Sequence, residues 1–280
     1  MKKVIYSNII LSSVLLSVGF IAALLLFGFV AFGTNDGLPP HAVELAGFTG
    51  AQVILSIIII YLMMKLDVFS RDDFRLKGLG KEILLGWVSI VGGIIASVGF
   101  LTMLPANSFI VPNIPHLLVV TLHPFVGTGL FEEVLFRGLV LKLLLCVMGD
   151  SKRRVIKACM ISAAIFGIVH ISNAFFGAGI LPTVAQVIMA TAAGIFFAAI
   201  YLRTKNLLAP ILLHGFFNFC SQIYHAIVSR DVFVQLMHEQ GEMTNIAFAG
   251  MMLFATVPYL IAGLVLLRKV KPRPSLECVE

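Results

Sequence analysis

Charged residues are scarce in this chain, because Asp, Glu, Lys and Arg together make up only 12% of its 280 residues. In soluble globular domains the charged share is about 25%. Hydrophobic residues reach 59%, and the mean hydropathy is +1.02. This composition excludes an ordinary soluble domain and indicates a protein that crosses a membrane several times.

Sequence patterns of several well-known enzyme classes are missing as well. The four cysteines show no CxxC spacing, so no zinc knuckle is indicated. The HExxH motif of soluble zinc proteases is absent, and no Ser or Cys stands obviously beside a histidine as a nucleophile. Any hydrolytic chemistry would therefore depend on other residue types.

Apolar runs long enough to cross about 30 Å of hydrocarbon recur along the sequence. They predict an all-α fold, a polytopic membrane helix bundle with about eight transmembrane helices. The predicted spans are 4–32, 48–66, 83–104, 117–145, 155–176, 183–203, 207–228 and 246–267. Pro124 is expected to kink or break the start of the fourth span. The first run follows Lys2 and Lys3, as the apolar core of a secretory signal peptide would. Its length is about twice the 7–15 residues of a usual signal core, so a retained helix is predicted.

The basic residues are distributed very unevenly between the loops. When both termini are placed in the cytoplasm, 18 of the 20 Lys and Arg residues fall on the cytoplasmic side, Arg230 on the other side and Arg137 within a span. This positive-inside pattern predicts cytoplasmic termini. The net charge of +6 then indicates contact with anionic lipid at the inner surface and no nucleic-acid partner. A bacterial cytoplasmic membrane fits the pattern, and a eukaryotic endomembrane would fit it too.

Three charged residues lie near the middle of the fourth predicted span: Glu132, Glu133 and Arg137. Each costs about 2.5–3.5 kcal/mol at the centre of a bilayer helix, so a function or a structural role must keep them there. Glu133 and Arg137 are i,i+4 neighbours and are predicted to form an ion pair. Glu132 points about 100° away and is predicted to face a pocket, where it could serve as a general base. A purely structural ion-pair network of all three residues is the alternative.

Two later spans bring histidines to a similar depth. Counted from the nearest basic residue at about 1.5 Å per residue, Glu132 lies about 15 Å, His170 about 20 Å and His214 about 13 Å from the inner side. Asn218 shares a helix face with His214. By the same count His123 and His225 belong to the outer interface, where they need no functional explanation. Gln186 and Thr191 could line a cavity, but bonding to a neighbouring group is the preferred interpretation.

This set of residues is compatible with two chemistries, both of which hydrolyse a peptide bond. In the first, Glu132 and His170 activate water while His214 and Asn218 stabilise the oxyanion of the tetrahedral intermediate. In the second, the histidines and a glutamate bind a divalent metal that activates the water.

The combined motifs resemble the CPBP family of intramembrane endopeptidases, which groups type II CaaX prenyl proteases with bacteriocin-processing and Abi-type proteins. The motifs are Glu132-Glu133-x-x-x-Arg137, Phe166-x-x-x-His170 and His214-x-x-x-Asn218, in that order on three membrane helices. The resemblance implies catalytic roles for Glu132, His170, His214 and Asn218, and supporting roles for Glu133, Arg137 and Phe166. Both metalloprotease and metal-independent glutamate-protease mechanisms have been described for the family. If a metal such as zinc is bound, its candidate ligands are Glu132, His170 and His214, although a metal-free mechanism is preferred.

The resemblance covers the fourth to seventh spans, so the chain divides into three predicted regions. Residues 1–116 contain the accessory helices 1–3, residues 117–228 the catalytic core with helices 4–7, and residues 229–280 the last helix and a basic tail. The expected substrate is a membrane-associated, lipidated or leader-bearing peptide or protein. The alternatives are a non-catalytic immunity or scaffold protein that keeps the family site, and an ion-coupled transporter.

Overall fold

The chain is described here by a computed structural model that covers residues 2–30, 40–102, 104–149, 151–176 and 178–270. Within these ranges no strand is formed, and the one antiparallel bridge joins Phe109 to Val228. The end of the predicted first span, 31–32, and most of the basic tail, from 271 onward, lie outside the described residues. The predicted all-α helix bundle is confirmed.

Most of the chain is α-helical, with short 3₁₀ and π segments between the longer helices. The α-helices are α1 (Lys2–Ser7), α2 (Ile9–Val30), α3 (Pro40–Lys65), α4 (Leu79–Leu85), α5 (Trp87–Leu101), α6 (Ile114–Leu122), α7 (Leu130–Glu133), α8 (Leu141–Met148), α9 (Lys152–Val169), α10 (Ile180–Thr204), α11 (Leu208–Gln222), α12 (Tyr224–Ile227) and α13 (Arg230–Arg268). The 3₁₀ segments are η1 (Arg71–Phe74), η2 (Ala106–Ser108) and η5 (His170–Phe176). The π-helical segments are η3 (His123–Gly129) and η4 (Val134–Val140).

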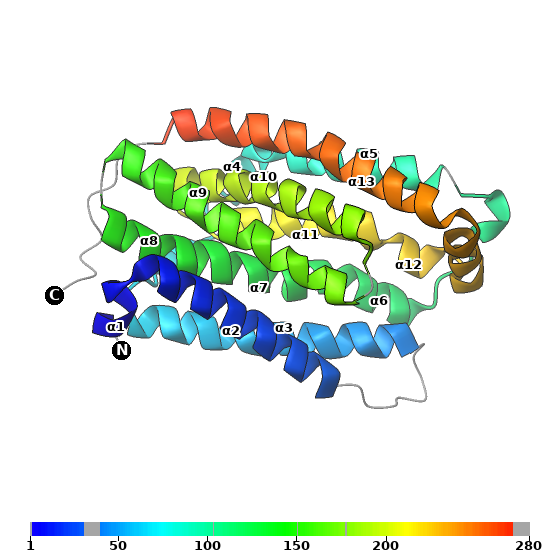
Figure 1. Cartoon of the computed structure of the whole chain (residues 1–280), viewed down its shortest axis with the longest axis horizontal. Helices are drawn as coiled ribbons and strands as arrows, with labels where there is room; N and C mark the ends of the chain where they lie inside the picture. Colours follow the sequence, from blue (N-terminus) through cyan, green and yellow to red (C-terminus); the bar gives the residue numbers. More distant parts are fainter. Residues whose placement is uncertain (1, 31–39, 103, 150, 177, 271–280) are drawn as a thin grey trace.

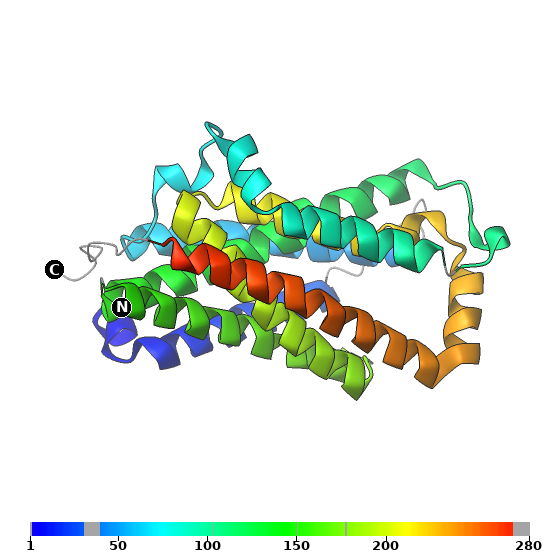
Figure 2. The ribbon, with the colours of Figure 1, turned by 90° about the horizontal axis from the view of Figure 1, so that it is seen from above.

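The long helices run roughly side by side along one axis of the molecule (Figures 1 and 2). Helix α10 packs against α9 and α13, while α11 packs against α5 and η3. Small residues give α10 its central place, because its buried stretch contains Ala192, Ala193 and Gly194. Small side chains of this kind allow the close helix packing on which membrane bundles depend.

Several helices are long and apolar enough to cross a membrane, so the chain is an integral multi-pass membrane protein. Among the described residues, five segments meet this condition: Ile9–Leu26, Val43–Lys65, Lys152–Phe175, Ile180–Thr204 and Asn245–Arg268. A sixth span is possible where α4 and α5 meet at a bend of 64°. The predicted spans 117–145 and 207–228 are built from shorter helical segments, and the total of eight stays a prediction.

Pro124 does not break the fourth predicted span, because the chain continues there as the π-helical segment η3. Proline lacks an N–H group, and its ring crowds the carbonyl four residues earlier, so a regular α-turn is disfavoured. The wider π-turn avoids this conflict. A second π-helical segment, η4, follows α7. The four residues of α7, which include Glu132 and Glu133, therefore lie between two widened turns.

The basic segments gather at one end of the bundle, which we call the basic end. There Lys2 contacts Asp67, Arg75 donates to the carbonyl of Thr204, and Lys152 donates to the carbonyl of Arg268. Figure 1 shows the start of α1, the turn between α8 and α9 and the end of α13 at this end. The opposite end, which we call the far end, contains η2, α12 and the start of α6 (Figures 1 and 2). This arrangement agrees with the charge-based topology, in which those segments share one side of the membrane.

Lys142, the basic residue from which the depth of Glu132 was counted, is not exposed. Its side chain is buried, donates to the carbonyl of Val68 at 2.7 Å and forms an ion pair with Asp73. Asp73 also accepts a hydrogen bond from the hydroxyl of Tyr201 at 3.1 Å. The loop that carries Asp73 is thereby fixed to α8 and α10 at the basic end.

Candidate active site

A cavity of about 550 Å³ lies beside α7 and collects the polar residues singled out in the sequence. Its wall includes Glu132, Phe166, His170, His214 and Asn218. These residues come from α7, α9, η5 and α11, which are far apart in the sequence. The structure therefore brings together the four residues expected to be catalytic.

Glu133 and Arg137 form the predicted ion pair, with 2.8 Å between Oε1 and Nη1. Both side chains are completely buried, at 0% and 1% exposure. The guanidinium of Arg137 also donates to the carbonyl of Gly194 at 3.3 Å and lies 4.4 Å from the centre of the Phe166 ring. A charge in such a place needs both a counter-ion and further polar or aromatic contacts, and Arg137 has them.

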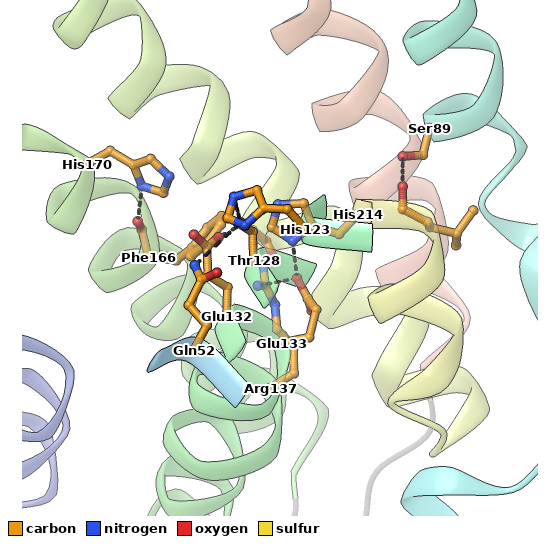
Figure 3. Close-up of polar contacts among 12 residues, drawn as sticks. Gln52, Ser89, His123, Thr128, Glu132, Glu133, Arg137, Phe166, His170 and His214 are labelled. Carbon is orange, nitrogen blue, oxygen red and sulfur yellow. Dashed lines mark hydrogen bonds and ion pairs between the residues drawn. The ribbon is translucent and has the colours of Figure 1, made fainter. Parts of the chain in front are cut away.

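The same oxygen of Glu133 also accepts a hydrogen bond from His214, with 2.8 Å between Oε1 and Nδ1 (Figure 3). Because an ionised carboxylate can only accept, Nδ1 of His214 carries the hydrogen. This bond fixes the orientation of the imidazole and leaves Nε2 facing the other carboxylate. The sequence had suggested no contact between Glu133 and His214.

Glu132 is the more accessible of the two glutamates, with 17% of its side chain exposed. Its Oε2 atom lies 3.7 Å from Nε2 of His214. This distance is too long for a hydrogen bond, and the two groups form an ion pair only when the ring is protonated. Glu132 faces the cavity, as the helical geometry predicted, while Glu133 is held behind it.

His170 is oriented by a backbone group. Its Nδ1 atom lies 2.8 Å from the carbonyl oxygen of Phe166, which can only accept, so Nδ1 is the donor (Figure 3). A neutral imidazole in this tautomer has its lone pair on Nε2. His170 lines the cavity, and Nε2 is therefore available as a proton acceptor there.

Phe166 packs between the charged and the imidazole groups. Its ring lies 5.0 Å from the His170 ring and 6.0 Å from the His214 ring, both edge to face. The same ring contacts Arg137. The Phe166 ring therefore contacts three motif side chains and holds them in place, which gives a physical reason for its supporting role.

Two glycines allow the helices around the site to approach closely. A Cβ atom on Gly215 would lie 2.6 Å from the Phe125 ring, and one on Gly167 only 1.9 Å from Oγ1 of Thr191. Larger residues at either position would push α11 away from η3, or α9 away from α10.

The sequence pointed to only one residue, Gln186, of an amide pair on the cavity wall. Nδ2 of Asn173 donates to Oε1 of Gln186 at 2.8 Å, and both residues line the cavity. Gln186 therefore does both things considered for it, lining the cavity and bonding a neighbour. Thr191 bonds the carbonyl of Val187 within its own helix, as preferred. Asn173 was missed, although its place three residues after His170 would have been a usable signal.

His123, which the depth count assigns to the outer interface, is buried within the bundle. Its ring is buried, with Nδ1 2.9 Å from the hydroxyl of Thr49 and Nε2 3.1 Å from the hydroxyl of Thr128. Because the Thr49 hydroxyl donates to the carbonyl of Leu45, it accepts from His123. The depth count could not predict this burial, because it measures position along one helix and takes no account of α3, which covers this face.

The candidate metal ligands do not form a metal site in this structure. Among the residues the structure describes, no three His, Cys, Asp or Glu side chains are grouped in a way that could hold a metal ion. Nε2 of His214 faces Glu132, but the set of Glu132, His170 and His214 is not assembled around one point. We therefore derive no step through a metal.

Comparison with known proteins agrees with the motifs. Residues 114–220 match the family model described as type II CAAX prenyl endopeptidase Rce1-like. This part of the chain is therefore similar to the Rce1-like peptidases, in agreement with the resemblance to the CPBP family. None of the curated proteins matches the chain. The matched range begins at α6 and ends in α11, so it contains all seven motif residues of this peptidase family.

Proposed function

We propose that this protein is an intramembrane endopeptidase that hydrolyses a peptide bond of a membrane-associated substrate. The observation that carries the proposal is the 3.7 Å approach of Glu132 to His214 on a cavity that also takes in His170 and Asn218. The family match supports the reaction class.

The reaction begins with water activation. Glu132 accepts a proton from a water molecule, assisted by the lone pair on Nε2 of His170. The resulting hydroxide attacks the carbonyl carbon of the scissile peptide bond and forms a tetrahedral intermediate. When this intermediate collapses, the C–N bond breaks and Glu132 returns its proton to the leaving nitrogen.

The oxyanion of the intermediate is stabilised by Nε2–H of His214 and the amide of Asn218. Since Nδ1 of His214 already donates to Glu133, Nε2 can donate only when the ring is an imidazolium.

The substrate is a lipidated, leader-bearing or membrane-inserted peptide. A cavity within the bundle is accessible to chains that already reside at the membrane, and its apolar wall, with Phe100, Phe248 and Met252, suits a hydrophobic segment. We place the protein in a bacterial cytoplasmic membrane, with anionic lipid at the basic end and no nucleic-acid partner.

The test compares peptide termini in membranes that contain either the wild type or Glu132→Gln at equal abundance. Loss of a general base typically lowers the rate by about 10²–10⁴-fold. A precursor that accumulates only with Glu132→Gln would establish proteolysis and identify the substrate. Equal termini in both membranes, where deletion of the gene has a phenotype, would favour the scaffold alternative instead.

A further inference from the structure

The cavity is placed asymmetrically along the bundle. Its lining residues come from the middle of the long helices and from the parts of these helices nearer the far end. Helix α5 contributes residues between Ala96 and Leu101, at its end away from the basic end, and α10 contributes between Gln186 and Phe197. Helix α11 contributes from His214 to Gln222, and α13 from Phe248 to Tyr259.

The turns of these helices closest to the basic end contribute nothing to the wall. No lining residue comes from 198–204 of α10, 208–213 of α11 or 260–268 of α13. Buried side chains close the cavity on this side, among them Leu213 and the pair of Glu133 and Arg137. A peptide that approached from the basic end would therefore meet a packed floor.

On the other side the wall reaches an exposed position. Ser221 lines the cavity and is itself exposed, and Gln222 and Tyr224 follow it at the far end. From His214 to Gln222 the cavity extends about 12 Å along α11, at about 1.5 Å per residue. Figure 2 shows α12 and the start of α13 at the end opposite to α1 and the end of α13.

We infer that the cavity takes its substrate from the membrane face opposite to the basic end. This inference rests on the proposed function and on the positive-inside rule, which places the basic end in the cytoplasm. The substrate is then a peptide whose scissile segment lies in the outer half of the membrane or beyond it, such as an exported leader-bearing peptide or the outer part of a membrane-inserted chain. A lipidated tail held at the cytoplasmic face would not reach Glu132 by this route.

The test uses thiol accessibility, which does not depend on turnover. In a background with the four native cysteines replaced by alanine, three single variants are made: Ser221→Cys in the cavity, Val111→Cys at the far end and Leu76→Cys at the basic end. Val111 is 94% exposed and Leu76 77% exposed, so both report the accessible face directly. Each variant is treated with a membrane-impermeant maleimide in intact bacterial spheroplasts and in inverted membrane vesicles.

The expected result is that Ser221→Cys and Val111→Cys react in spheroplasts, while Leu76→Cys reacts only in inverted vesicles. Reaction of Ser221→Cys together with Leu76→Cys in inverted vesicles would overturn the inference, as would failure of Ser221→Cys to react from either side. Adding Glu132→Gln to each variant should leave the labelling unchanged. If labelling follows the expectation but no precursor accumulates with Glu132→Gln, the proposed protease activity fails while the direction of access stands.

Discussion

Glu133 and His214 are joined by a hydrogen bond of 2.8 Å although they are 81 positions apart in the sequence. The same carboxylate oxygen of Glu133 also pairs with Arg137. Glu133 therefore orients a residue of the cavity and balances a buried cation at the same time. The second glutamate of the motif thus has a structural task that differs from the task of Glu132.

We expect Glu133→Gln to damage both folding and activity, whereas Glu132→Gln should affect activity alone. The glutamine would leave Arg137 buried without its counter-ion, which costs on the order of 3–5 kcal/mol. Glu132 is partly exposed and lies 3.7 Å from His214, beyond hydrogen-bond distance, so its substitution should leave stability nearly unchanged. Thermal denaturation of both variants in detergent, together with their turnover, separates the two roles. Equal melting temperatures would contradict this division.

Arg137→Ala should also destabilise the protein by about 3–5 kcal/mol, because it leaves the carboxylate of Glu133 buried and unpaired on that side. Arg137→Lys is the matched comparison. Lysine keeps the charge but has neither the planar stacking on Phe166 nor the second donor that reaches Gly194. We expect lysine to restore only part of the stability, measured by thermal denaturation. Full restoration would show that charge alone is required.

The amide pair on the cavity wall is expected to bind the backbone of the substrate. After Asn173 has donated to Gln186, the oxygen of Asn173 and the nitrogen of Gln186 remain to bond a peptide group. Asn173→Ala should raise KM with little change in kcat, by about 3–10-fold for one hydrogen bond of 0.5–1.5 kcal/mol. Thr191→Val, outside the cavity wall, is the control and should leave KM unchanged. A fall in kcat at constant KM would assign Asn173 a different role.

Removal of the hydrogen bond between Thr49 and His123 should destabilise the protein without abolishing catalysis. Thr49→Val leaves the buried His123 donor without its partner, at a cost of about 1–3 kcal/mol. Thr49→Ser keeps the hydroxyl and should behave like the wild type. Chemical or thermal unfolding of the two variants, with turnover measured alongside, tests the assignment. Equal stability of the valine and serine variants would argue against it.

The metal-free mechanism predicts that activity survives treatment with a strong zinc chelator. Purified protein is dialysed against 1,10-phenanthroline, and cleavage of the identified precursor is then followed with and without added zinc. Retained activity is the expected result. Loss of activity that zinc restores would assign Glu132, His170 and His214 as ligands, in a geometry different from the one described above.

The sequence predicted the fold class and the pair of Glu133 and Arg137 because both follow from local rules. Apolar runs of sufficient length predict helices, and an i,i+4 spacing predicts contact on one helix. The sequence also predicted a similar membrane depth for Glu132, His170 and His214, because the depth of each residue was counted from a basic residue nearby.

These local rules do not predict contacts between different helices. The bond from Glu133 to His214, the burial of His123 behind α3 and the pairing of Asn173 with Gln186 depend on how the helices rotate against one another. The burial of Lys142 was missed for the same reason, because its partner Asp73 lies in a loop that folds back onto α8. The π-helical turns leave no periodic signal in an apolar run, so Pro124 was the only hint of them.

These two π-helical turns let the span absorb a change of one residue in chain length near the carboxylates. Each π-turn holds one residue more than an α-turn, so deleting a single apolar residue from η3 would let that segment tighten toward an α-helical turn. This tightening would absorb most of the change in rotation, and Glu132 would still face the cavity. The same deletion from the regular α-helix α6 has no such reserve and would rotate everything beyond it by about 100°, which turns Glu132 away from the cavity. A gap of one residue upstream of the motif would thus be harmless in one turn and inactivating in the turn before it.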